Sequence, residues 1–574
     1  MVQQSQTVVW SVVAAYMVIV TLAGFYYSRY MKTADAFFKA SNTVPWWAAG
    51  IAIYKANFTA YTFTAIASLV YIDGLSGLLL ESGPALAFLL AAVVFSQRWR
   101  RLNLTSPPEY LEARFNPFTR QTFSVLGIAQ TFIASGMRLY AVCKLVESIM
   151  GMPLVPTIII AGGVMITYTM LGGLSAVVVT DVLQFLILFL AAVPLFISSV
   201  AHIFMETTLA GFIAQIPAGY ASFPHPDHGR TLGWLMAFWF AYLLDYNGDW
   251  GVIQMMCSTK SERDAKKAAY LSMAFGIPHA FLLLGPCFIA RVLWAGQIAD
   301  PNIVGQAETV YGKVALKLLP AGMIGVVAAA MLAATMSTLS VAWSVRSTSF
   351  VNDLYARFLR PKAGDKEKIF VGRLALLFIG GVATGVALLV ATRSSGLFSL
   401  AQDLIGFVVI PLILPLLLGL LIEKTQPWSA LATLGSCIAF AALNRFGYNL
   451  LGLAAPLGFG AEVAVSTILG TAVMLGSGLL PRDQAYGARV RQFFTRMDRP
   501  LPPLEGEVCI PAPLGILGVL TLLVGGLVVL LGWLPQSLMD RFLTMGAGGV
   551  LALVGLWMRR QHRATKGANA ATGG

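Results

Sequence analysis

Polar residues at the centres of two apolar segments are the first sign of chemistry in this sequence. Segment 44–72 carries a lysine among amide and hydroxyl side chains: Lys55, Asn57, Thr59, Thr62 and Thr64. Segment 322–346 carries the string AATMSTLS, from Ala333 to Ser340. If both segments are helices that cross a membrane, such groups are costly and usually face a cavity or a partner. Hydroxyls and carbonyls can bind a small cation there, and an ammonium group can replace one.

The elements that must position these groups are long apolar runs. Of the 574 residues, 57% are hydrophobic and 11% are charged, and the mean hydropathy is +0.75. Runs of about 20 apolar residues match the hydrocarbon thickness of a bilayer. We therefore expect an all-α polytopic membrane protein with about fifteen transmembrane helices. The expected spans are 8–27, 44–72, 77–97, 122–150, 153–172, 176–203, 232–257, 269–296, 322–346, 369–392, 396–423, 428–445, 461–480, 513–532 and 541–558.

The basic excess of the chain, a net charge of +13, follows the connections between these spans. With the N-terminus outside, 27 Lys and Arg residues lie in cytoplasmic segments and 4 in outer segments. This asymmetry is the positive-inside pattern, and it predicts an external N-terminus and a cytoplasmic C-terminus in a plasma or bacterial inner membrane. The charge thus indicates topology, aided by anionic lipid, and not a surface for nucleic acid.

Cysteine and histidine spacing indicates neither a disulfide framework nor an intramembrane metal site. The five cysteines are dispersed, at Cys143, Cys257, Cys287, Cys437 and Cys509, and the five histidines are His202, His225, His228, His279 and His562. An outer PHPDHG string, which contains His225 and His228, can bind a metal adventitiously but is better explained as an ordinary polar loop. We expect no enzyme, no organic cofactor and no metal beyond a possible sodium ion.

Three strings in order resemble a known family. They are FFKASNTVPWWAAGIAIYKANFTAYTF, MLGGLSAVVVTDVLQFLILF and AAAMLAATMSTLSVAWSVRSTSFVNDLY. Over about 30–360 the chain resembles the sodium:solute symporter family, especially its sialic-acid and sugar branch, and the likeness weakens toward about 450. The resemblance implies a LeuT-type core of two five-helix repeats, the second inverted, with sites at the repeat interface near the midplane.

This resemblance also implies an organisation along the chain. The expected divisions are an N-terminal extra helix and loop (1–43), a first repeat (44–203), an outer loop (204–231), a second repeat (232–423), C-terminal extra helices (424–558) and a basic cytoplasmic tail (559–574).

The family's main sodium site combines carbonyls of a broken first core helix with a carbonyl and hydroxyls of the eighth. The matching positions here are Lys55, Phe58, Ala334, Ser337 and Thr338. The two hydroxyls are kept, but Lys55 stands where typical relatives have a small alanine.

Lys55 has three interpretations that the sequence leaves open. Its ammonium can replace the sodium ion, and if its pKa is depressed it can instead carry a proton. Alternatively sodium still binds and Lys55 contacts the solute, or Lys55 forms a structural salt bridge.

A second cation site of some relatives matches Asp181 and Ser340, although Val341 replaces a further useful hydroxyl. Asp181 can equally be a structural carboxylate that caps the helix beginning near Gly173. With both ion sites altered, we expect transport that does not strictly require sodium.

Substrate contacts are expected near these sites. The candidates are Asn57, Thr59, Thr62, Glu81, Arg138, Asp245, Asp249 and Gln254, most of them by match to the family's sugar or sialic-acid contacts. Glu81 can instead pair with Lys55 or Arg138.

The sixth core helix has its own chemistry. Its two carboxylates, Asp245 and Asp249, suggest an amine-bearing or cationic solute, or a charge balance for Lys55 and Arg138. A break is expected at Asn247-Gly248, and the surrounding aromatics can stack on a solute or merely pack: Trp239, Tyr242, Tyr246 and Trp250. Elsewhere, Lys144 and Glu147 are spaced to pair on one helix face.

These features predict a secondary transporter that moves a small polar solute by alternating access, sodium-independent or proton-coupled because of Lys55. The alternatives are a conventional sodium symporter with Lys55 as a substrate ligand and a solute-sensing receptor without net transport. The expected partners are the solute and the lipid bilayer, with a monomeric transport unit and no nucleic acid.

Overall fold

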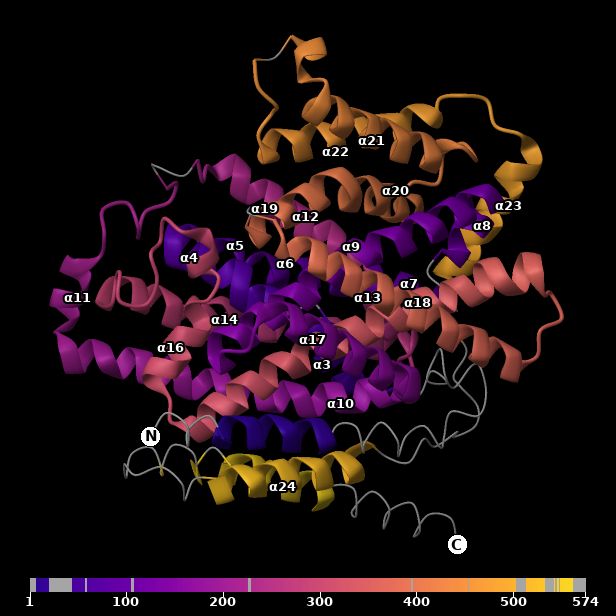
Figure 1. The fold of residues 1–574 in the computed structure, drawn as a ribbon. Helices are drawn as coiled ribbons and strands as arrows, with labels where there is room; N and C mark the ends of the chain where they lie inside the picture. Colours follow the sequence, from indigo (N-terminus) through magenta and orange to yellow (C-terminus); the bar gives the residue numbers. More distant parts are fainter. Residues whose placement is uncertain are drawn as a thin grey trace, which may run out of the picture.

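The computed structural model describes residues 7–19, 44–56, 59–104, 108–225, 229–393, 396–452, 454–501, 513–531, 541, 545–546 and 548–560. These residues form a bundle of helices (Figure 1). Extended pairing in the described ranges is limited to isolated bridges between Val44 and Thr259 and between His225 and Arg230. The expected all-α class is confirmed.

The helices of the first half are α3 (Trp46–Ala56), the π-helical η2 (Thr62–Ile66), α4 (Ala67–Asp73), α5 (Leu75–Leu80), α6 (Gly83–Leu90), the π-helical η3 (Ala91–Phe95), α7 (Ser96–Leu102), α8 (Glu109–Arg114), α9 (Pro117–Met150), α10 (Leu154–Glu206), α11 (Leu209–Gln215), α12 (Leu232–Gly248), α13 (Trp250–Cys257) and α14 (Glu262–Leu293). An apolar helix, Thr7–Ile19, precedes them.

The second half contains α15 (Val304–Ala307), α16 (Val310–Leu318), α17 (Ala321–Ser349), the π-helical η4 (Phe350–Leu359), α18 (Asp365–Ala391), α19 (Leu397–Leu404), the π-helical η5 (Ile405–Val409), α20 (Ile410–Leu421), α21 (Ser429–Phe446), the short 3₁₀ helix η6 (Tyr448–Leu451), α22 (Phe459–Ser477), α23 (Gln484–Asp498) and α24 (Pro513–Leu531).

Nine helices in the described ranges are long and apolar enough to cross a membrane, and four shorter apolar helices accompany them. The number falls below the fifteen expected spans partly because an interrupted segment contains no single helix long enough to cross a membrane. The first and sixth core segments are both interrupted, the first between Ala56 and Thr62 and the sixth at Asp249. The length of a single helix therefore undercounts the crossings in such a chain.

One expected boundary differs. We expected two spans, 153–172 and 176–203, separated at the Gly172-Gly173 pair, but the backbone is helical throughout α10. At 1.5 Å per residue its 53 residues exceed the thickness of one bilayer. Glycine weakens a helix by only about 1 kcal/mol, so a glycine pair permits a break without requiring one.

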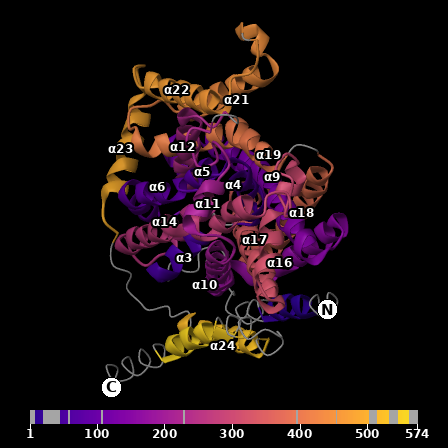
Figure 2. The ribbon, with the colours of Figure 1, turned by 90° about the vertical axis from the view of Figure 1, so that its left-hand side faces the viewer.

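The eighth core helix, α17, lies at the centre of the bundle (Figure 1). Of its most apolar window 94% is buried, compared with 28% for α22. α17 packs against α3, α9, α10, α13 and α18. The helix Thr7–Ile19 and α24 cover α10 on one side (Figure 2). Side chains of these three helices and of α17 line a small apolar cavity. The segment AATMSTLS is thus held inside protein on every side.

Candidate functional site

The interruption of the first core helix lies against α17. α3 ends at Ala56, Thr59 is not helical, and the backbone is helical again from Ala60 into η2. The N–H of Ala60 donates to the Thr335 hydroxyl at 3.0 Å, and the N–H of Tyr61 donates to the Thr59 hydroxyl at 3.1 Å. Polar side chains therefore satisfy the backbone groups that the interruption releases, as irregular backbone at membrane depth requires.

Lys55, near the end of α3, is fully buried, and its ammonium lies between two helix α10 side chains. Nζ donates to Asp181 Oδ1 at 3.1 Å and to Gln184 Oε1 at 2.5 Å. The Ser337 hydroxyl of α17 donates to the same Asp181 oxygen. Gln184 in turn donates to the Tyr16 hydroxyl at 2.9 Å. The ammonium is thus held by a network that joins four helices.

This network unites residues from both expected cation sites. Lys55 and Ser337 come from the first site and Asp181 from the second, so Asp181 neutralises the ammonium. The Thr338 hydroxyl donates to the Ala334 carbonyl at 3.0 Å, and Ser340 shares a 2.8 Å hydrogen bond with Thr169 on α10. Ser340 therefore bonds to a different part of α10 from Asp181. Phe58, with Asn57, lies outside the described residues.

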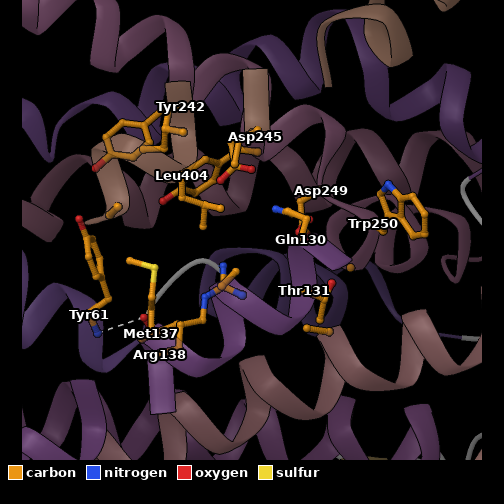
Figure 3. A pocket seen from close by; sticks show the side chains of 18 of the residues that line it. Tyr61, Gln130, Thr131, Met137, Arg138, Tyr242, Asp245, Asp249, Trp250 and Leu404 are labelled. Carbon is orange, nitrogen blue, oxygen red and sulfur yellow. Dashed lines mark hydrogen bonds between the residues drawn. The ribbon is translucent and has the colours of Figure 1, made fainter. Parts of the chain in front are cut away.

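A cavity of about 150 Å³, partly open to the outside, lies near this network. It is enclosed mainly by α9, α12 and α17 and by the segment from α19 to η5. Six of the expected substrate residues line it: Thr59, Thr62, Glu81, Arg138, Asp245 and Asp249. Figure 3 shows Arg138 and Met137 on one side, and Tyr242 and Asp245 on the opposite side. Gln254 is buried on α13 and does not line the cavity.

The sixth core helix breaks where the Asn247-Gly248 pair predicted. α12 ends at Gly248 and α13 begins at Trp250, with Asp249 between them. The Asp249 carboxylate accepts from the Val252 N–H at 3.0 Å, which caps α13 and places a negative charge at a helix N-terminus. A Cβ at Gly248 would lie 2.2 Å from Cγ2 of Ile413, so only glycine lets α20 approach the break this closely.

Arg346 of α17 is a cavity residue that sequence reasoning missed. Its Nε donates to the Thr131 hydroxyl at 2.7 Å, and its guanidinium carbon lies 3.4 Å from the centre of the Trp250 ring. Nη2 donates to Gln130 at 3.2 Å. A basic residue is common at the end of an apolar run that is expected to face the cytoplasm, so Arg346 was not recognised from the sequence as a residue of the site.

Glu81, at the end of α5, pairs with neither Lys55 nor Arg138. Its Oε1 lies 3.2 Å from Nε2 of His279 on α14, and Oε2 accepts from the Tyr242 hydroxyl at 3.3 Å. Nδ1 of His279 lies 2.7 Å from the Tyr54 hydroxyl of α3. A lone histidine in an apolar helix is usually an ordinary core residue, so no sequence pattern singled out His279.

Two further predictions concern residues away from Lys55. The pair on α9 is confirmed, since Lys144 Nζ donates to Glu147 at 2.7 Å. Of the aromatic residues around the sixth helix, Tyr242, Tyr246 and Trp250 line the cavity, whereas the Trp239 indole donates to the Leu79 carbonyl at 3.0 Å. The ring of Phe238 also lines the cavity. No cluster of three or more metal-ligating side chains occurs in the described part of the chain.

Comparison with known proteins gives consistent matches. The model of the sodium:solute symporter family matches residues 37–435. A sodium/glucose cotransporter of Vibrio parahaemolyticus is 28% identical over 463 residues, which cover 76% of this chain and 84% of the relative. A sodium/sialic acid symporter of Proteus mirabilis is 27% identical over 462 residues, which cover 77% of this chain and 90% of the relative.

A solved structure has the same fold. It is a Na⁺-coupled sialic acid symporter in a substrate-bound, outward-open state, with a TM-score of 0.66 and 23% sequence identity. The match covers 83% of this chain and 98% of that protein. The described bundle therefore shares its fold with that protein.

Proposed function

This chain belongs to the sodium:solute symporter family, and we propose that it carries a small polar organic solute by alternating access, with Lys55 in place of a coupling sodium ion. The observation that carries the proposal is the contact of Lys55 Nζ with Asp181 and Gln184. A tethered ammonium there supplies the positive charge that a bound ion would supply in a relative. Transport would then proceed without sodium.

Charge and burial support this role over that of a substrate ligand. The side chains of Lys55 and Asp181 are 0% and 1% exposed, and neither lines the cavity. A buried charge is tolerated when it is paired and hydrogen-bonded, as the ammonium is here. A solute in the cavity would meet Arg138, Asp245 and Asp249 instead.

One observation favours the conventional alternative, in which sodium still binds. The second oxygen of Asp181, Oδ2, is buried and has no hydrogen-bond partner among the described residues. A carboxylate oxygen of this kind is a suitable ligand for a cation or a water molecule. The deciding question is therefore whether sodium, and not another ion, stabilises the wild-type protein.

The test compares purified wild-type protein and Lys55→Ala in sodium chloride and in potassium chloride of equal ionic strength. A ligand at 100 times its dissociation constant adds about 2.7 kcal/mol of stability. We expect the melting temperature of the wild type to be the same in both salts. Lys55→Ala should be less stable in potassium and recover in sodium, because the ion can then fill the space beside Asp181.

Lys144→Ala is the matched control, because it removes a lysine that pairs with a carboxylate on the partly exposed surface of α9. Its melting temperature should not depend on sodium. Sodium-specific stabilisation of the wild type would contradict the proposal and establish the conventional symporter. Unchanged sodium-independent uptake of glucose or sialic acid by Lys55→Ala in liposomes would also contradict it. Binding of a solute without net uptake would indicate a receptor.

A further inference from the structure

Three side chains in hydrogen-bond contact, Tyr54, His279 and Glu81, connect the interior of the bundle with the cavity. Tyr54 lies on α3, His279 on α14, and Glu81 lines the cavity at the junction of α5 and α6. The two contacts measure 2.7 Å from Tyr54 to Nδ1 and 3.2 Å from Nε2 to Glu81. His279 and Glu81 are 5% and 4% exposed. Both nitrogens of one buried imidazole are therefore engaged at hydrogen-bond distance.

This geometry accommodates two protonation states without loss of a hydrogen bond. With a neutral imidazole, Nε2–H donates to an ionised Glu81 and Nδ1 accepts from the Tyr54 hydroxyl. After uptake of one proton at Nδ1, that nitrogen donates to the Tyr54 oxygen, whose hydroxyl hydrogen turns away. The formal charge of the His279–Glu81 pair changes from −1 to 0. Histidine is the side chain best suited to make such a change near neutral pH.

The two ends of this series of side chains have different surroundings. The Tyr54 ring is packed by Phe185 and Phe275, with ring centres 5.8 and 5.6 Å away. Glu81 borders the cavity, where Oε2 accepts from the Tyr242 hydroxyl. The carboxylate of the pair is therefore the member in contact with the cavity.

Other titratable side chains lie close enough to Glu81 to interact with it electrostatically. Tyrosines of three neighbouring segments interact with it electrostatically: Tyr54, Tyr61, Tyr242 and Tyr246. The charged residues of the cavity wall are Arg138 on α9, Asp245 on α12, Asp249 at the α12–α13 break and Arg346 on α17. Tyrosines are neutral below about pH 10, so the charged neighbours of the His279–Glu81 pair are these carboxyl and guanidinium groups.

The charge of the cavity wall gives proton uptake a consequence for transport. The wall carries three carboxyl groups, on Glu81, Asp245 and Asp249, and two guanidinium groups, on Arg138 and Arg346. When all five are ionised the wall has one excess negative charge. Enclosing an uncompensated charge away from water is costly. A proton on the His279–Glu81 pair removes the excess and favours closure around a solute that itself has no net charge.

We propose that the His279–Glu81 pair is a proton-binding site that couples the movement of one proton to the movement of an uncharged or zwitterionic solute. This inference rests on the proposed transport function and adds a coupling ion to it. It also separates two roles, because Lys55 then keeps its charge while His279 and Glu81 exchange the proton. The site is distinct from the Lys55–Asp181 network, since neither Lys55 nor Asp181 lines the cavity.

The direct test needs no solute. Full-length protein with ¹⁵N-labelled histidine is reconstituted in lipid, and its imidazole nitrogens are observed by solid-state NMR at about pH 8 and about pH 5. The signal of His279 is the one that disappears in His279→Gln, whose amide can still bond to Glu81. We expect this signal to change from one protonated nitrogen to two as the pH falls. In Glu81→Gln the change should be absent from this pH range.

His202→Gln is the matched control, because His202 is a partly buried histidine of α10 whose Nδ1 donates to the Ser198 carbonyl of the same helix at 2.8 Å. It should leave the His279 signal and its pH response unchanged. A His279 imidazole that stays neutral at both pH values overturns the proposal. So does a response that persists unchanged in Glu81→Gln.

A second measurement distinguishes this inference from the proposed function. In sodium-free liposomes, an inward gradient of one pH unit should raise the accumulation of glucose, a probe without charge, by about tenfold. The rise should disappear in His279→Gln and remain in His202→Gln. Sodium-free uptake without this rise would refute the proton site and leave the role of Lys55 intact. Uptake that requires sodium would refute the role of Lys55.

Discussion

The Lys55–Asp181 network and the central cavity both contain buried charges, but the charges are paired in the network and border an open volume in the cavity. Lys55 is held by Asp181 and Gln184 within a packed junction of helices. In the cavity, the guanidinium groups of Arg138 and Arg346 and the carboxyl groups of Asp245 and Asp249 line the same open space. A charge that is fully paired contributes to a fixed structure. A charge beside an open volume remains available for a solute or a proton.

This difference separates stability from binding. Removing one partner of a buried ion pair leaves an uncompensated charge and costs about 3–5 kcal/mol, whereas an apolar replacement of both partners is often tolerated. A charge that borders a partly open cavity stays partly solvated, so its loss should affect the solute more than the fold. The next three predictions test this contrast.

The largest effect is expected for Lys55→Met in potassium buffer. It leaves Asp181 without its cation and should lower the stability of the protein by about 3–5 kcal/mol. The double variant Lys55→Met/Asp181→Leu should recover most of that loss, because neither charge remains. Thermal melting of the purified proteins measures both effects. If the double variant is less stable than Lys55→Met, the pair does not act as a compensated charge unit.

A smaller effect, on binding alone, is expected for Asp245→Asn in the cavity. The change keeps the shape of the side chain and removes its charge, so the melting temperature should stay close to that of the wild type. Uptake is measured with glucose and with sialic acid as probes. For a probe that the wild type takes up, uptake by Asp245→Asn should fall about 10–100-fold, which corresponds to about 1.4–2.8 kcal/mol. Asp403→Asn is the control and should transport normally, because Asp403 on α19 pairs with Arg445, is 59% exposed and does not line the cavity.

The smallest effect is expected at the ion cluster of Glu112 on α8. Its carboxylate accepts from Arg357 at 2.8 Å and from Arg120 at 2.9 Å. The hydrogen bond from Arg357, more than the other interactions, lowers the pKa of Glu112 to about 2. Because the group is partly exposed, Glu112→Gln should cost no more than about 1 kcal/mol.

The sign of the pH dependence follows from this lowered pKa. The contribution of Glu112 is complete above its unfolded pKa of about 4.3 and is lost as the pH falls toward about 2. The difference in melting temperature between the wild type and Glu112→Gln should therefore be constant above about pH 5 and shrink below about pH 4. A difference that grows on acidification would mean that the ion cluster does not hold the carboxylate ionised.

Several features of the fold follow from local rules and were accessible from the sequence. The helical class comes from apolar runs whose length matches a bilayer. The break of the sixth core helix follows from Asn247-Gly248, because these residues favour a turn and Asp249 is a good cap for the next helix. The pair of Lys144 with Glu147 depends only on helical spacing. Each of these depends on neighbours along one segment.

Other features depend on contacts between distant segments. Lys55 stood out as a midplane lysine, but its partners Asp181 and Gln184 are more than 120 residues away. His279 and Glu81 are separated by 198 positions, and neither position suggests the other. Three interpretations of Lys55 were open at the level of sequence because a side chain of that length can reach several neighbours.

The sequence by itself determined the membrane class, the family and the polar residues that a bilayer would not tolerate without partners, because hydropathy, spacing and ordered motifs are properties of the chain. The tertiary structure decided which partner each polar residue takes. It paired Lys55 with Asp181, packed the guanidinium of Arg346 over the Trp250 ring, and brought Glu81 within hydrogen-bond distance of His279. The physical reason is that a buried charge must be neutralised by whichever group packing brings within hydrogen-bond distance. Helical periodicity within one segment does not specify that packing.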